Sequence, residues 1–232
     1  MDKSGAAFAE APDAAFYPEL VEQGGLYRVL QRIGEERGLD LGDVRPGSDR
    51  GLAVYRTAKS DSSRGAIRIS TVLNRRAFSI VFDSAVGSYV WAEGSATEPD
   101  QVAGVIDSWR GGMLLVPLRE AFPFMQFSPM SQGYERGTQV ETAWGLLLTG
   151  DAHASRRGML TVLQADSLVS GLFPFFSMGT LRLARDCFDR EAGSISIDGQ
   201  EDGRYSVRSS FDGALLADVE LSNLADAVAS LI

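Results

Sequence analysis

The hydrophobic pattern changes from a helical period to a strand period twice along the chain, and each strand-like region ends in a helical stripe. In the first region, short runs rich in β-branched and aromatic residues are separated by Gly, Ser, Asp and Asn. Apolar residues at helical spacing then follow Pro99 and stop at Gly111 and Gly112. The pattern predicts an antiparallel β-meander covered by a helix, with strands at residues 52–57, 66–72, 78–82 and 89–92.

Two further segments belong to this first region. A helix is expected before the meander, because Leu26, Val29, Leu30 and Ile33 share one helical face and Gly38 is a natural C-terminal cap. The polar segment 59–65 is expected to be a flexible connection between strands, with a mobile functional loop as the alternative.

The C-terminal part has a similar arrangement. Strands are expected at 194–197, 205–209 and 214–221, with glycine turns between them, and a helix capped by Ser222 follows. This likeness has two interpretations: a true structural repeat, or two short β-hairpins and a helix that look alike by chance. No long stretch of identity joins the two halves.

The middle of the chain, residues 113–170, is expected to be helical. Thr138 and Glu141 have the spacing of a capping box, and the apolar stripe that contains Trp144 follows and ends at Gly150. Another helix is expected to start at Met159 and reach Val169, after which strands resume.

These patterns together predict an α+β protein. Two antiparallel β-meanders, each covered by a helix, are joined by a helical, aromatic-rich middle. We expect a disordered leader at 1–15, an N-terminal part at 16–112 and a C-terminal part at 113–232. The alternative is that the last two parts form one compact domain.

The chain is acidic, with 31 acidic and 22 basic residues and a formal net charge of −9. Because binding to nucleic acid normally needs a concentrated basic face, we expect no nucleic-acid partner. A single cysteine, Cys187, excludes an internal disulfide and a multi-cysteine zinc site. We find no signal-peptide pattern and no run of about eighteen apolar residues, so we expect a cytoplasmic protein without a membrane partner.

The segment from Leu172 to Arg185 combines three phenylalanines, a Gly-Thr turn and a strand-like run with two arginines. Guanidinium groups beside a Gly-Thr turn can bind a carboxylate or phosphate through two hydrogen bonds. Residues three apart on a strand face opposite sides, so the alternative is that one arginine pairs with a local acid such as Asp186. The candidate ligand-binding residues are Arg182, Arg185, Thr180, Trp144 and Phe175.

The aromatic residues of the middle section have two interpretations. They bury large areas and several lie on helical stripes, which favours a solid core. The alternative is a ligand pocket that some of them line. The set consists of Trp109, Phe122, Phe124, Phe127, Trp144, Phe173, Phe175 and Phe176.

No catalytic constellation is expected. The only histidine, His153, lies in a polar segment, where a solvated position is favoured over a pair with Asp151 and a distant serine. Ser177 lacks the glycines of a nucleophile elbow. The acids that follow Arg185 lack the spacing of a calcium loop. We therefore predict no catalytic residue, no metal and no cofactor.

Four motifs together resemble a bacterial family that is common in actinomycetes. They are Trp109-x-Gly-Gly-x-Leu-Leu, Phe122-Pro-Phe-x-x-Phe-Ser, Glu135-Arg-Gly followed by Val140-Glu-x-x-Trp144, and Leu172-Phe-Pro-Phe-x-Ser-x-Gly-Thr-Leu-Arg182. The similarity covers mainly residues 16–42 and 99–220. Members are described as proteins of unknown function, and some carry a natural product biosynthesis label, so the resemblance implies a link to such pathways but no catalytic residue or cofactor.

The sequence therefore favours a non-enzymatic cytoplasmic binding or accessory protein, whose partner is a protein or a small molecule. One alternative is a small-molecule enzyme that uses arginine and carboxylates, which a pocket with two carboxylates converging on Arg182 or His153 would support. Another alternative is an immunity-type protein whose acidic surface blocks a basic toxin.

Overall fold

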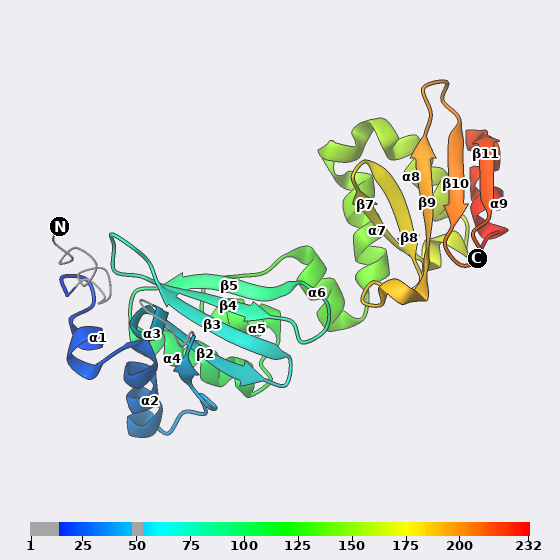
Figure 1. Ribbon diagram of the computed structural model, residues 1–232. Coiled ribbons are helices and arrows are strands. Elements are labelled where there is room, and N and C mark those ends of the chain that lie inside the picture. The colour runs from blue at the N-terminus through cyan, green and yellow to red at the C-terminus, as the bar shows by residue number, and fades with distance from the viewer. Residues whose placement is uncertain (1–13, 48–52) are drawn as a thin grey trace, which may run out of the picture. The chain divides into compact units, whose positions relative to one another are not determined.

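A computed structural model describes residues 14–47 and 53–232 of the chain. The protein is α+β, as predicted, and contains two antiparallel sheets with helices (Figure 1). Contacts within the chain divide it between Ser131 and Gln132, later than the boundary expected after Gly112. We call the two parts the N-terminal unit and the C-terminal unit and describe each separately. Residues 1–13 of the expected leader lie outside the described residues.

The sheet of the N-terminal unit is a six-stranded meander in which each strand pairs with the next one along the chain. Its middle strands cover the predicted runs 66–72, 78–82 and 89–92 except for Val72 and Tyr89, which confirms those three predictions. The strands are β1 (Arg45–Pro46), β2 (Thr57–Ser62), β3 (Gly65–Thr71), β4 (Phe78–Asp83), β5 (Val90–Ala96) and β6 (Met125–Gln126).

Helices pack on one face of this sheet. Strand alternation places Ile69, Ile80 and Phe82 on that face, and the Phe82 ring stacks on Trp109 with centroids 4.7 Å apart. The helices expected at Leu26 and at Pro99 are both confirmed. The helices are α1 (Pro18–Gln23), α2 (Leu26–Arg37), α3 (Ala53–Arg56), α4 (Pro99–Arg110), α5 (Leu115–Ala121) and α6 (Pro129–Arg136), which ends beyond the division between the units.

The prediction for the first strand was wrong. Of the expected strand 52–57, Leu52 lies outside the described residues, Ala53–Arg56 is the helical turn α3, and the strand begins only at Thr57. Most of the segment expected to be a flexible connection is therefore β2. Its Ser60 is fully buried and donates a hydrogen bond to the Leu41 carbonyl at 2.6 Å, so tertiary contacts override a weak strand propensity.

The sheet of the C-terminal unit is a five-stranded meander, again in chain order. The strands expected at 194–197 and 205–209 are confirmed, the one expected at 214–221 is shorter and spans Leu215–Val219, and the segment after Leu172 forms a hairpin in front of them. The proposed structural repeat of the two halves stays a prediction. The strands are β7 (Phe173–Ser177), β8 (Thr180–Ala184), β9 (Ser194–Gly199), β10 (Tyr205–Ser209) and β11 (Leu215–Val219).

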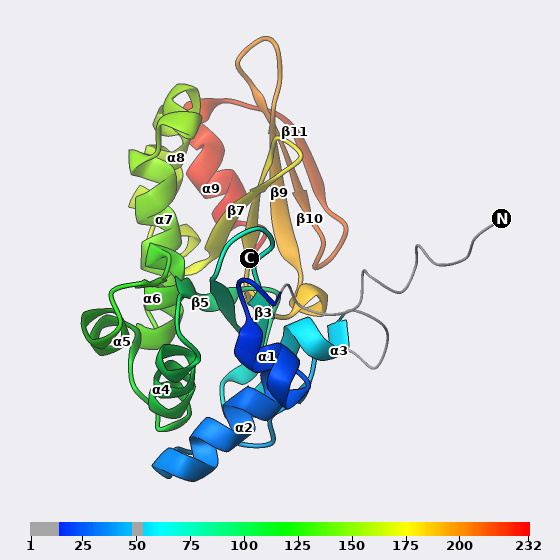
Figure 2. The same ribbon diagram turned by 90° about the vertical axis from the view of Figure 1, so that its left-hand side faces the viewer.

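Three helices cover one face of this sheet (Figure 2): α7 (Gln139–Thr149), α8 (Arg157–Ala165) and α9 (Leu224–Ala229). The core lies between them and the sheet, where Leu181, Leu183, Ile195, Ile197 and Val207 contact Trp144, Leu160, Leu163 and Leu224. Because side chains alternate along a strand, the residues between these apolar positions point to the opposite face.

Two predicted helix caps are wrong although their helices are confirmed. The Thr138 side chain caps nothing, and its carbonyl instead accepts a hydrogen bond from the Thr142 hydroxyl at 2.8 Å. Ser222 lies in the 3-10 turn Leu221–Asn223 that precedes α9. A capping box does form at α4, between Glu98 and Gln101.

The helix expected to span 159–169 is shorter, because α8 ends at Ala165 and a 3-10 turn, Val169–Gly171, follows. Within the described ranges, none of the helices is both long and apolar enough to cross a membrane.

Candidate ligand-binding site

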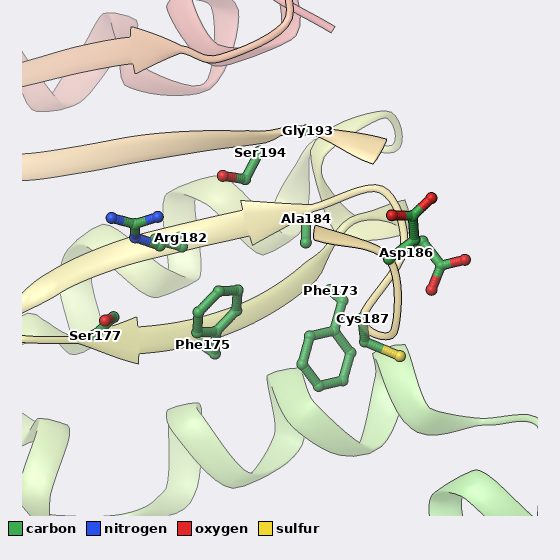
Figure 3. A pocket seen from close by; sticks show the side chains of 10 residues that line it. Phe173, Phe175, Ser177, Arg182, Ala184, Asp186, Cys187, Gly193 and Ser194 are labelled. Atoms are coloured by element: carbon green, nitrogen blue, oxygen red, sulfur yellow. The ribbon is translucent and has the colours of Figure 1, made fainter. Parts of the chain in front are cut away.

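A hollow with a volume of about 550 Å³ lies on the C-terminal sheet, beside β7, β8 and the start of β9 (Figure 3). It lies on the face opposite the helical core. The loop between Ala184 and Ser194 bounds one end of it. Its lining includes Phe173, Phe175, Ser177, Arg182, Cys187 and Ser194.

The β7–β8 hairpin places aromatic and cationic side chains next to each other. Strand alternation points Phe173 and Phe175 to the hollow, and cross-strand pairing puts Phe175 opposite Arg182. Met178 and Gly179 form the tight turn, with φ of 50° and 90°. Positive φ at both central residues matches the twist of a two-residue hairpin, which fixes this register. The turn is thus one residue earlier than the predicted Gly-Thr turn.

Arg182 is exposed, and its guanidinium makes no ion pair or hydrogen bond with another described residue. The alternative pairing with Asp186 is wrong. Asp186 lies at the other end of the hollow, with Ala184 between the two charged groups and the phenylalanine rings to one side (Figure 3). Its carboxylate accepts the Phe188 N–H at 2.8 Å and so holds the turn of its own loop.

Arg185 does not lie beside Arg182. This separation was expected, because residues three apart on a strand face opposite sides. Its guanidinium carbon lies 4.0 Å from the centroid of the Phe211 ring, and it donates a hydrogen bond to the Ile232 carbonyl. A cation over an aromatic face is a stabilising contact within the fold. The prediction that Arg185 binds the ligand therefore has no support from its position.

Two other predicted residues also lie away from the hollow. The Thr180 hydroxyl donates to the Asp198 carboxylate, and Thr180 is not among the residues that line the hollow. Trp144 is 1% exposed, and its indole N–H donates to the Leu172 carbonyl at 3.1 Å. Trp144 is a core residue whose polar atom is satisfied inside the protein.

The aromatic set divides between the two predicted interpretations. Trp109 and Trp144 are buried core residues, whereas the phenylalanines of the set are only partly buried. Phe173 and Phe175 line the hollow with ring centroids 6.3 Å apart, so the solid-core interpretation is wrong for these two. Tyr134 of α6, which the sequence did not single out, stacks on Phe173 at 6.5 Å between centroids.

The lone histidine lies elsewhere in the unit. His153 belongs to the 3-10 helix Asp151–Arg156 and stacks on the Phe176 ring with centroids 4.5 Å apart. Its Nδ1 is buried and has no hydrogen-bond partner within residues 14–47 and 53–232. His153 is half-buried and not fully solvated, and Asp151 does not bond to the imidazole among these residues.

Cys187 lies in the hollow but is not arranged as a nucleophile. Burial and the neighbouring Asp186 carboxylate raise the pKa of the thiol above its ordinary value. Since the thiolate is the reactive form, this surrounding lowers the reactivity of Cys187. No group of three or more His, Cys, Asp or Glu side chains in the described part of the chain is arranged to hold a metal ion.

One arginine that the sequence reasoning missed shares the open face with Arg182. Arg208 of β10 is exposed and lies two strands away, with Ser196 between them. In the sequence, Arg208 is a polar residue between the apolar positions of the expected strand 205–209. Only the order of the strands shows that this strand lies next to β9, with β8 on the other side of β9.

The chain was compared with models of protein families, with curated proteins and with solved structures, and none of the three comparisons found a match. The resemblance to the actinomycete family stays a prediction.

Proposed function

We propose that this protein is a non-enzymatic binding protein that holds a small organic anion with an aromatic or apolar part on the open face of its C-terminal sheet. The observation that carries the proposal is the exposed guanidinium of Arg182, which has no acidic partner in the described chain and lies opposite Phe175. A cation and an aromatic surface side by side recognise the two parts of such a ligand.

The chemistry of the lining supports this ligand class. A guanidinium binds a carboxylate or phosphate group through two parallel hydrogen bonds, and the ring of Phe175 offers a flat apolar surface next to it. The hydroxyls of Ser177 and Ser194 at the edges of the hollow supply neutral donors.

An enzyme that uses arginine and carboxylates would need acids that act with Arg182. Asp186 and Asp189 line the hollow, but each carboxylate accepts a backbone N–H of its own loop at 2.8 Å. Neither forms an ion pair with Arg182 in the described chain. Their positions favour a structural role in the loop, and this supports binding over turnover.

The cellular role proposed here follows the sequence analysis. A cytoplasmic accessory protein of a natural product pathway would hold an intermediate or a product, and many such molecules combine an aromatic part with an acid. This role rests on the resemblance of the sequence motifs.

The test is a binding measurement with defined aromatic carboxylates. Benzoate and phenylacetate, with neutral benzyl alcohol as the comparison compound, are titrated against the full chain and followed by NMR. We expect the carboxylates to bind and Arg182→Ala to weaken them by about tenfold or more, because a charge-assisted hydrogen bond is lost. Phe175→Ala should weaken benzyl alcohol and carboxylates alike.

Arg204→Ala is the matched control. Arg204 is another exposed arginine of the same unit, but it pairs with Glu220 at 3.5 Å and is not part of the lining. The proposal is wrong if no carboxylate binds to the folded protein, or if Arg182→Ala binds as well as the original chain. Chemical conversion of any ligand during the titration would support the enzyme alternative instead.

A further inference from the structure

We infer that Arg182 and Arg208 together form a site for a phosphomonoester group, centred over Ser196. This inference rests on the proposed function and names the ligand class more closely. The cross-strand register carries it: Ser196 of β9 is paired with Arg182 of β8 on one side and with Arg208 of β10 on the other. The three side chains therefore lie in one row on one face of the sheet.

The spacing of this row suits a single anion held from two sides. Neighbouring strands lie about 4.8 Å apart, so the Cα atoms of the two arginines are separated by roughly 10 Å. Both side chains are long and exposed, and both can incline over the half-buried Ser196, whose hydroxyl adds a donor between them.

Neither arginine has a charge partner within the fold. Neither guanidinium makes an ion pair, hydrogen bond or ring contact with any residue of the described chain. Two like charges on one sheet face repel each other, so folding gains nothing from their position. The nearest acid on this face in the register is Asp198, and the Thr180 hydroxyl hydrogen-bonds its carboxylate.

The charge of the pair selects the ligand class. A phosphomonoester carries nearly two negative charges at neutral pH and three terminal oxygens, which match two guanidinium groups approaching from opposite sides. A carboxylate has one charge and two oxygens, which a single arginine satisfies. The same row continues to Phe175 beyond Arg182, so the organic part of the ligand would lie on that ring.

Phenyl phosphate is the probe that tests this site, and benzoate is the comparison ligand. Both are titrated against the full chain, and the Nε–H signals of Arg182 and Arg208 are followed by NMR. We expect both signals to shift with phenyl phosphate. Arg182→Gln and Arg208→Gln should each weaken phenyl phosphate by about tenfold or more, because each removes a charge-assisted contact.

Benzoate separates this inference from the proposed function. Arg182→Gln should weaken benzoate, whereas Arg208→Gln should leave its affinity unchanged within about twofold, because one arginine is enough for a carboxylate. Asp198→Asn should strengthen phenyl phosphate, since it removes a like charge from the same face. Arg204→Ala again serves as the control.

The outcomes test the two-arginine site and the proposed function separately. If Arg208→Gln leaves phenyl phosphate binding unchanged while Arg182→Gln weakens it, the two-arginine site is wrong and the proposed function stands. If neither anion binds to the folded chain, both are wrong. A phosphotyrosine peptide distinguishes the source of the group: binding equal to phenyl phosphate indicates a small ligand, and markedly tighter binding indicates a phosphorylated protein partner.

Discussion

The open faces of the two sheets carry similar numbers of arginines, but those of the N-terminal sheet pair with acidic residues and those of the C-terminal sheet do not. In the N-terminal unit, Arg68 pairs with Asp83, with Nη2 and Oδ1 2.8 Å apart, and Arg45 pairs with Asp61. Lys59 lies between these arginines in the register. In the C-terminal unit, the arginines at 182 and 208 face Ser196 and an aromatic ring instead of acids.

The difference teaches that unpaired arginines here do not result from a shortage of acids. The chain has 31 acidic residues and 22 basic ones, so partners are abundant. Exposed ion pairs contribute only about 0–1 kcal/mol to stability, but they neutralise a surface. Arg68 and Arg45 on the N-terminal face have acidic partners, whereas Arg182 and Arg208 have none among the described residues.

The largest expected change in ligand affinity comes from adding an acidic partner for the arginines of the C-terminal face, like those on the N-terminal face. Ser196→Asp places a carboxylate between Arg182 and Arg208, where it occupies both guanidinium groups and repels an anion. We expect the affinity for phenyl phosphate to fall by at least about tenfold. The free energy of unfolding should change by no more than about 1 kcal/mol. Calorimetric titration and urea denaturation measure the two quantities.

Ser196→Asn is the control for this variant, because it has the same shape without the charge. It should bind phenyl phosphate within about threefold of the original chain. Equal losses in the two variants would show that the shape at this position, and not its charge, controls binding, and the contrast between the faces would then have no functional meaning.

The second effect concerns the loop that bounds the hollow, for which the most constrained position is Gly193. Its φ is +84°, and a Cβ there would lie 2.3 Å from the Phe211 ring. Gly193→Ala therefore combines backbone strain with a clash, and we expect it to lower the free energy of unfolding of the C-terminal unit by about 3 kcal/mol. Urea denaturation followed through the amide signals of each unit measures this loss.

Gly203→Ala isolates the clash from the strain. Gly203 has nearly the same φ, +83°, but its Cβ would meet no atom within 4 Å. We expect a loss of only about 1 kcal/mol there. If both variants lose the same amount, the contact with Phe211 does not hold the loop.

A third, smaller effect concerns the reactivity of Cys187 at the end of the hollow that contains Asp186. Because Asp186 raises the pKa of Cys187, Asp186→Asn should lower that pKa, increase the thiolate fraction at pH 8 and speed alkylation by iodoacetamide severalfold. The asparagine oxygen still accepts the Phe188 N–H, so the loop is kept. Mass spectrometry over time gives the rate.

Asp189→Asn is its matched control, since Asp189 lines the same hollow but is not among the groups that raise the pKa of the thiol. Its alkylation rate should equal that of the original chain. A rate that rises equally in both variants would show that general loop loosening, and not charge, controls the thiol.

The sequence predicted the elements that have a clear period. The stripes of α2, α4 and α7 and the runs of β3, β4 and β10 were found because each pattern is local. Strand β2 was missed because its polar residues carry no strand signal, and the contact of Ser60 with Leu41 that fixes it is distant in the chain.

The candidate site was only half predictable, for a related reason. Arg182 and Phe175 are close in the sequence and form one hairpin, so both were found. Arg208 was missed because its place in the row depends on the order and register of β8, β9 and β10. Which face of the hairpin the helices cover is likewise set by tertiary packing, and this is why the sequence left core and pocket open for Phe173 and Phe175.

The smallest effect compares one exposed carboxylate of each unit. The guanidinium of Arg110, 3.1 Å away, chiefly holds the pKa of Asp40 below its usual value, whereas the Ala214 N–H chiefly does so for Asp212. Because its pKa is lowered in the folded state, each carboxylate stabilises the protein above about pH 4. That stabilisation is lost as the pH falls through the pKa of the folded state.

Salt should separate the two carboxylates. Dissolved salt screens an ion pair on the surface, but it does not screen a short hydrogen bond from a backbone amide. We expect 1 M NaCl to move the pKa of Asp40 back toward its usual value and to leave that of Asp212 nearly unchanged, as measured by NMR titration of the carboxyl carbons. Arg110→Ala should reproduce the salt effect at Asp40 alone. Equal shifts at both sites would mean that the N-terminal unit does not depend on arginine–carboxylate pairs any more than the C-terminal unit does, and the contrast between the two surfaces would be confined to Arg182 and Arg208.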